Sequence, residues 1–152
     1  MGRYSWQGLN NQQIGRYAEY FVKMEFTMHG FEVYSSEVDD RGIDFVVRSQ
    51  SGHFYEIQVK STRNAYVFSS KDKMALTPQR LLALVLFDEA KEPSLFLIPS
   101  MDWNTPDTLL KDHRYEGKKS KPEWGVNISG RTRPLLERYK FSDTVAKLEG
   151  RK

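Results

Sequence analysis

A helix followed by a run of short strands is the pattern that most limits what this chain can fold into. At residues 11–29 the apolar side chains recur at the spacing of an amphipathic helix, and Gly30 follows where a left-handed helix stop is expected. Three strand-like segments come next, at 31–34, 42–48 and 54–60, separated by turn-like polar residues. We expect the last two segments to form a hairpin.

Further elements are predicted in the second half of the chain, where segment 81–87 fits either a buried strand or a helix. A helix, a strand meander and then mixed strands and helices predict one α/β domain, residues 1–152, with a central mixed β-sheet flanked by helices. The other predicted elements are strands at 66–68, 96–98 and 126–128, a helix beginning at Thr77-Pro78, a short helix from Ser100 or Asp102 to Leu110, a surface loop at 111–121 and a closing helix at 142–148.

Composition excludes several classes of protein. Of the 152 residues, 39% are hydrophobic and 28% are charged, which suits one packed domain and excludes a disordered tail or a collagen-like rod. The longest apolar run, residues 81–87, is far shorter than the roughly 18 residues of a membrane span, so no membrane partner is expected. Without cysteine there are no disulfides or thiolate sites, and the N-terminus lacks the apolar core of a secretory signal. We therefore expect a cytoplasmic protein.

The net charge of +3 is unevenly distributed. Residues 1–100 hold 11 basic and 12 acidic side chains, whereas residues 101–152 hold 12 basic and 8 acidic ones. A solvated face and a phosphate-binding face explain this basic C-terminal third equally well. The lysine cluster at 118–121 is explained more simply as solvated surface. Arg131 and Arg133 are stronger candidates for DNA contact. The predicted nucleic-acid contacts are Lys118, Lys119, Lys121, Arg131, Arg133 and Arg63.

Asp44 interrupts an otherwise apolar strand-like segment. The next strand alternates strictly, so that Glu56, Gln58 and Lys60 share one face. Taken alone, Asp44 is explained as a strand-edge or turn-capping residue, and the polar face as solvated surface. A hairpin, however, can bring Asp44 near Gln58 and Lys60. Oxygen donors beside a lysine suit Mg²⁺-assisted phosphodiester hydrolysis.

Three short segments in this order resemble a known family. GRYAE at residues 15–19, GID at 42–44 and QVK at 58–60 are similar to the motifs of the PD-(D/E)XK nuclease superfamily. Within this superfamily they are more similar to the branch of small intron-encoded homing endonucleases and archaeal Holliday-junction-resolvase-like proteins, with similarity over about residues 13–63. The resemblance implies a restriction-endonuclease-like core and a Mg²⁺-dependent DNA endonuclease, in which Mn²⁺ substitutes.

The resemblance implies catalytic roles for four side chains. Asp44 is the principal metal ligand, Glu19 an outer metal-site carboxylate, and Lys60 the lysine near the attacked phosphate. Gln58 departs from the usual pattern, because most of the superfamily has Asp or Glu there, although the homing-endonuclease branch uses glutamine. Its amide oxygen can ligate Mg²⁺ but adds no negative charge. Glu56, one pleat earlier on the same face, either assists the metal or is simply solvated.

Several alternatives stay open. Glu19 lies off the apolar stripe of its helix, so a surface carboxylate paired with Arg16 also explains it. One small subunit has little surface for reading a long DNA site, so a homodimer or homotetramer is expected. No glycine-rich phosphate loop is present, and no organic cofactor is expected. The rival functions are a catalytically weak or inactive nucleic-acid-binding module of the same fold, and an interaction or immunity-type protein.

Overall fold

The computed structural model describes residues 2–35, 37, 41–63 and 65–150. Its elements are α1 (Asn11–Met28), β1 (Glu32–Ser35), β2 (Phe45–Arg48), β3 (Phe54–Thr62), β4 (Val67–Ser70), β5 (Arg80–Leu86), β6 (Ser94–Pro99), the 3₁₀ helix η1 (Ser100–Asn104), β7 (Leu110–His113), β8 (Glu123–Val126), the 3₁₀ helix η2 (Arg133–Tyr139) and α2 (Phe141–Leu148).

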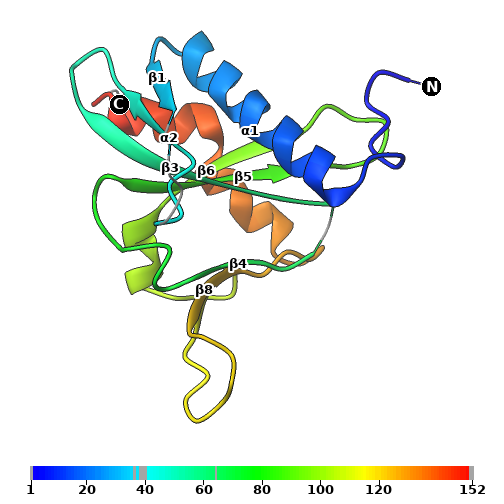
Figure 1. Ribbon diagram of the computed structural model, residues 1–152, viewed down its shortest axis with the longest axis vertical. Coiled ribbons are helices and arrows are strands. Elements are labelled where there is room, and N and C mark those ends of the chain that lie inside the picture. The colour runs from blue at the N-terminus through cyan, green and yellow to red at the C-terminus, as the bar shows by residue number, and fades with distance from the viewer. Residues whose placement is uncertain (1, 36, 38–40, 64, 151–152) are drawn as a thin grey trace.

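The strands form two sheets. A five-stranded sheet has the order β1-β2-β3-β5-β6, in which β3 and β5 are parallel and all other neighbours are antiparallel. A three-stranded antiparallel sheet has the order β4-β8-β7. The α-helices pack on one face of the large sheet, and the small sheet covers the other (Figure 1). The predicted α/β class with a central mixed sheet and the β2–β3 hairpin are confirmed.

Strand β5 is buried along its whole length, because both faces of the large sheet are covered. Its alternate side chains enter two different hydrophobic clusters. This explains why residues 81–87 show no polar alternation, and it decides between the two predicted structures in favour of a strand. Leu81, Ala83 and Val85 pack with α1 and α2, whereas Leu82, Leu84 and Leu86 pack with the small sheet.

Helix α1 follows the predicted bounds closely. The Asn10 side chain accepts a hydrogen bond from the Gln13 backbone N at 2.8 Å, and the Gln13 side chain accepts one from Asn10 N at 2.9 Å. This capping box fixes where the helix begins. Gly30, with φ of +86°, follows the end of the helix as predicted. The buried stripe of Ile14, Ala18, Phe21, Val22 and Phe26 lays the helix over the sheet.

Two predicted elements near the middle of the chain are wrong or shortened. No helix begins at Thr77-Pro78, because the chain turns there and enters β5 at Arg80. The helix expected up to Leu110 ends as η1 at Asn104. The Asp107 side chain then accepts hydrogen bonds from the backbone N of Leu109 and Leu110, both at 2.8 Å, and turns the chain into β7.

The boundaries of the later elements also differ from prediction. The expected loop at 111–121 begins inside β7, and the strand expected at 126–128 is β8, which ends at Val126. Strand β2 begins at Phe45 rather than at residue 42. Helix η2 was not predicted. The strands expected at 66–68 and 96–98 and the closing helix are confirmed as β4, β6 and α2.

Within the described part of the chain, no helix is long and apolar enough to cross a membrane.

Candidate active site

Asp44 lies immediately before β2, at the point where this strand separates from β3. Its backbone N donates to the Ile57 carbonyl oxygen at 2.8 Å, and its Oδ2 accepts a hydrogen bond from Val59 N at 2.7 Å. The Asp44 side chain thus replaces a backbone partner of β3. Because the N–H groups of a strand point within the plane of the sheet, this carboxylate oxygen lies at the sheet edge, between the two faces.

The side chains of β3 leave the sheet on alternate faces, as the sequence predicts. Ile57 and Val59 pack toward α1. Gln58 and Lys60 are paired with Leu82 and Leu84 of β5, which belong to the cluster on the opposite face. Gln58 and Lys60 therefore lie on the face of the sheet opposite the one that α1 covers.

Gln58 carries the clearest sign of a missing partner. Its side chain is only 5% exposed, and its Oε1 is buried with no hydrogen-bond partner among the residues that the structure describes. Leaving a buried amide oxygen unsatisfied costs about 1–3 kcal/mol. An oxygen ligand of a cation is a natural use for such a group, because Mg²⁺ prefers hard oxygen donors.

The segment entering β2 is held tightly against Gln58. Gly42 has φ of +74°, and a Cβ there would lie 2.8 Å from Gln58 Nε2 and even closer to the Lys73 carbonyl oxygen. Only glycine fits this approach. Arg80, only 4% exposed, donates to the carbonyl oxygens of Lys73 at 2.9 Å and Arg41 at 3.3 Å. This clamp holds the chain before Asp44 beside Gln58.

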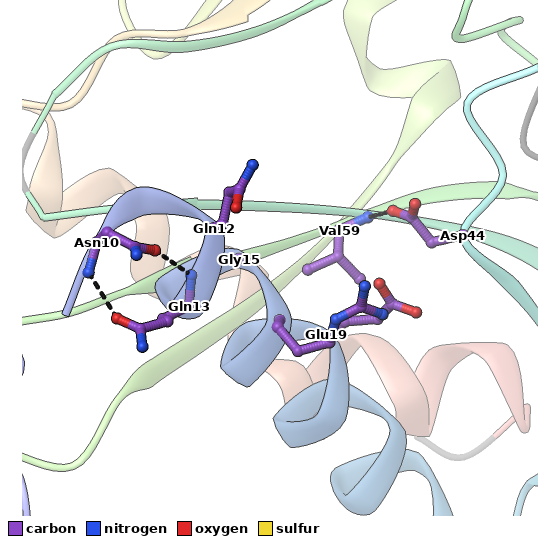
Figure 2. Close-up of a pocket in the computed structure, with 8 residues that line it drawn as sticks. Asn10, Gln12, Gln13, Gly15, Glu19, Asp44 and Val59 are labelled. Atoms are coloured by element: carbon purple, nitrogen blue, oxygen red, sulfur yellow. Dashed lines mark hydrogen bonds between the residues drawn. The ribbon is translucent and has the colours of Figure 1, made fainter.

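Glu19 reaches the same edge from α1. A pocket of about 640 Å³ is lined by the N-terminal half of α1 together with Asp44 and Val59, and Glu19 belongs to its wall. Figure 2 shows Asp44 bonded to the Val59 backbone, with Glu19 entering from the helix. The carboxylate of Glu19 pairs with Lys23 at 3.3 Å, one turn later, rather than with Arg16 as the alternative interpretation supposed.

Lys60 is partly buried and lies two residues beyond Gln58 on the same face of β3. Its side chain forms no hydrogen bond and no ion pair with any described residue. A lysine without a carboxylate partner keeps its positive charge available to an incoming anion.

Glu56 has another partner. Its Oε1 accepts a hydrogen bond from Arg80 Nε at 3.3 Å, and the two side chains form an ion pair. No group of three or more Asp, Glu or His side chains placed to hold a metal occurs in the described ranges. The remaining candidate donors are Asp44 and Glu19, which line the pocket, and Gln58, which lies on the face of β3 opposite α1 and does not line that pocket. This set suits Mg²⁺, which commonly binds one or two carboxylates and retains several waters.

Two of the predicted DNA-contacting arginines have protein partners. Arg63 donates to the carbonyl oxygens of Trp6, at 3.1 Å, and Leu9. Arg133 forms a bidentate pair with Asp88 at 2.9 and 3.0 Å, which holds the pKa of the Asp88 carboxyl below its usual value. These contacts tie the N-terminal segment and η2 to the body of the protein.

The remaining predicted contacts are exposed. Lys118, Lys119 and Arg131 lie in solvent and form no ion pair with a described residue. Lys121 pairs with Asp72 at 3.4 Å, in an exposed contact that contributes little stability. Their role in DNA binding stays a prediction.

The mixed five-stranded sheet flanked by helices has a restriction-endonuclease-like fold. Hjc, a Holliday junction resolvase from Archaeoglobus fulgidus, has this fold with a TM-score of 0.58 and 15% identity, over 91% of this chain and 97% of Hjc. The bacterial homing endonuclease I-Ssp6803I has a TM-score of 0.57 and 18% identity, over 93% of this chain and 94% of its own. No known family model matches the sequence, and neither does any curated protein.

Proposed function

We propose that the protein is a metal-dependent DNA endonuclease of the homing or junction-resolving type. The observation that carries the proposal is the buried Oε1 of Gln58, which has no hydrogen-bond partner among the described residues, on the strand that Asp44 caps at the fork. Two nucleases with the same fold support a DNA nuclease as the broader class. Mg²⁺ is the proposed cofactor, with Mn²⁺ as a substitute.

Each side chain has a distinct part in this proposal. Asp44 and Gln58 hold the cation, and Glu19 adds a second carboxylate from α1. A bound Mg²⁺ supplies Lewis-acid stabilisation of the phosphate oxygens. Lys60 contacts a non-bridging oxygen of the scissile phosphate and stabilises the negative charge that develops on it. Asp44 is fixed for this role by its hydrogen bond to Val59 N, which sets the orientation of its carboxylate before substrate binds.

The proposed enzyme acts as a homodimer or homotetramer. Cutting both strands of a duplex needs two sites of opposite polarity, which a two-fold axis supplies. Each subunit contributes one Asp44 and one Lys60.

A binding module of the same fold is the second candidate. The observation that favours it is the low negative charge of the donor set, in which a neutral Gln58 stands beside Asp44 and the carboxylate of Glu19 is already paired with Lys23. This version binds DNA without cutting it.

Purified protein should nick or linearise DNA when Mg²⁺ is present. Supercoiled plasmid and a four-way junction, each incubated with Mg²⁺, Mn²⁺ or EDTA, test this on a gel. We expect cleavage of at least one substrate with either metal and none with EDTA. Salt-dependent binding without cleavage under both metals would contradict the nuclease and favour the binding module.

Replacing Gln58 with glutamate should make stability depend on metal. In metal-free buffer, the buried carboxylate has no described partner, so we expect a loss of about 2–3 kcal/mol and a Tm lower by roughly 5–10 °C. Millimolar Mg²⁺ should restore most of this difference, because the added charge strengthens metal binding.

Gln58→Met is the matched control, since methionine has a similar volume and lacks the oxygen. Its Tm should equal or exceed that of the wild type and should not respond to Mg²⁺. Thermal unfolding followed by circular dichroism measures all three proteins. An equal response of both variants to Mg²⁺ would exclude a metal at this position.

A further inference from the structure

The small sheet has an outer face that the hydrophobic core does not use. Val67, Val126 and Leu110 align across its three strands and pack into the core. Their neighbours Phe68, Gly125 and Lys111 align on the opposite face. Phe68 is 51% exposed there, although burying its ring would be favourable.

Four aromatic side chains form a continuous row on this outer face. Tyr66 stacks on Phe68, with centroids 6.0 Å apart and planes 18° apart, and meets the His113 ring at 5.8 Å. His113 in turn stacks on Tyr115 at 5.4 Å and 14°. We call Phe68, Tyr66, His113 and Tyr115 the aromatic row.

Two contacts hold the middle of the aromatic row in place. The Tyr66 hydroxyl donates to Glu123 Oε2 at 2.5 Å, and burial together with this bond raises the pKa of Tyr66. The Tyr66 ring lies so close to Gly125 that any Cβ there would collide with it. The half-exposed Phe68 therefore stacks on a ring that is already held in place. This lowers the entropic cost of binding a ligand against Phe68.

Residues 111–121, which we call the basic hairpin, adjoin the aromatic row. The loop between β7 and β8 extends away from the rest of the molecule (Figure 1). Segment 111–121 contains five basic and two acidic residues, a net charge of +3 that equals the charge of the whole chain. Such a surface attracts a polyanion, and exposed rings add faces on which bases can stack.

One segment links this surface to the candidate active site. Lys71 N donates to the Pro122 carbonyl oxygen at 2.9 Å, at the base of the hairpin. Two residues later, the Lys73 carbonyl oxygen accepts from Arg80 and contacts Gly42, beside Gln58. The same backbone segment thus connects the base of the hairpin to the candidate active site.

We propose that the outer face of the small sheet binds DNA with unstacked bases, the aromatic row receiving a base and the hairpin holding the flanking phosphates. The choice of DNA as the partner rests on the proposed nuclease function. Bases inside a regular duplex offer no free faces to a ring, so Phe68 distinguishes branched or locally opened DNA from intact duplex.

Binding of fluorescent DNA, measured by anisotropy in EDTA, tests this surface apart from cleavage. The probes are a duplex with a short unpaired bubble and the fully paired duplex of the same length. We expect Phe68→Ala to weaken bubble binding about tenfold or more and duplex binding about twofold or less. Phe68→Leu should behave similarly, because leucine keeps the apolar bulk and lacks the π-face.

Phe54→Ala is the matched control. Phe54 is 52% exposed, on β3 of the large sheet, and has an arginine, Arg48, over its ring. It should leave the Kd for both probes unchanged. The double variant Lys118→Gln, Lys119→Gln should weaken binding to both probes equally and reduce the salt dependence of binding.

The outcomes separate this inference from the nuclease. Wild type that cleaves DNA, together with Phe68→Ala that binds the bubble normally, would overturn the DNA surface alone. Wild type that binds the bubble through Phe68 but cuts no DNA would overturn the nuclease alone. Wild type without affinity for either probe would overturn both.

Discussion

Replacing Asp44 with asparagine should reduce DNA cleavage on the order of 1000-fold while leaving the fold intact. Asparagine keeps an oxygen that can accept the hydrogen bond from Val59 N, so the strand fork stays closed. It removes the negative charge that holds the proposed Mg²⁺, and metal stabilisation of the transition state contributes several kcal/mol, at 1.36 kcal/mol for each tenfold in rate. Single-turnover cleavage with saturating enzyme measures the effect.

Asp143→Asn is the control for this variant. Asp143 is an exposed residue of α2, so the same chemical change there should leave the cleavage rate and the Tm close to wild type. Asp44→Asn with unchanged cleavage would show that the metal site lies elsewhere. If Asp44→Asn instead lowered the Tm together with the activity, Asp44 would be identified as a structural cap.

The second large effect is expected for Lys60→Met. Methionine retains most of the apolar stem of lysine and removes only the ammonium. Because Lys60 forms no ion pair with a described residue, its loss should cost little stability, yet cleavage should fall about 100-fold or more. Binding of DNA in EDTA should change less than threefold, since one phosphate contact among many is lost.

Lys60→Arg gives a sharper comparison. Arginine restores the charge with a different shape, so we expect partial recovery of the rate. Lys147→Met, at an exposed position of α2, controls for loss of one positive charge. Equal rates for Lys60→Met and the wild type would remove the lysine from the mechanism.

Much of the fold follows from local periodicity. Helix α1 and the alternation of β3 are visible in the sequence because each buries one face. The sequence of β5 shows no alternation of apolar and polar residues, because both faces of this strand are buried. Its structure is therefore not visible in the pattern. The turn from η1 into β7 depends on the Asp107 side chain, and no pattern of apolar residues encodes such a contact.

The candidate site was predictable only in part. The motif predicts Asp44, Gln58 and Lys60. The structure places Asp44 at the strand fork and the other two on the face of β3 opposite α1, and a site shared by the three stays a prediction. The clamp of Arg80 and Gly42 joins residues distant in sequence, although an arginine at the start of an apolar strand was a visible anomaly. The carbonyl partners of Arg63 and the Asp88 partner of Arg133 are equally non-local.

A crystal structure of the protein soaked with Mn²⁺, with anomalous diffraction to locate the metal, is the most direct examination of these ideas. The proposed function predicts one peak at the strand fork, within about 2.0–2.4 Å of an Asp44 carboxylate oxygen and Gln58 Oε1. A Gln58 oxygen still without a partner, or a metal bound far from Asp44, would contradict it.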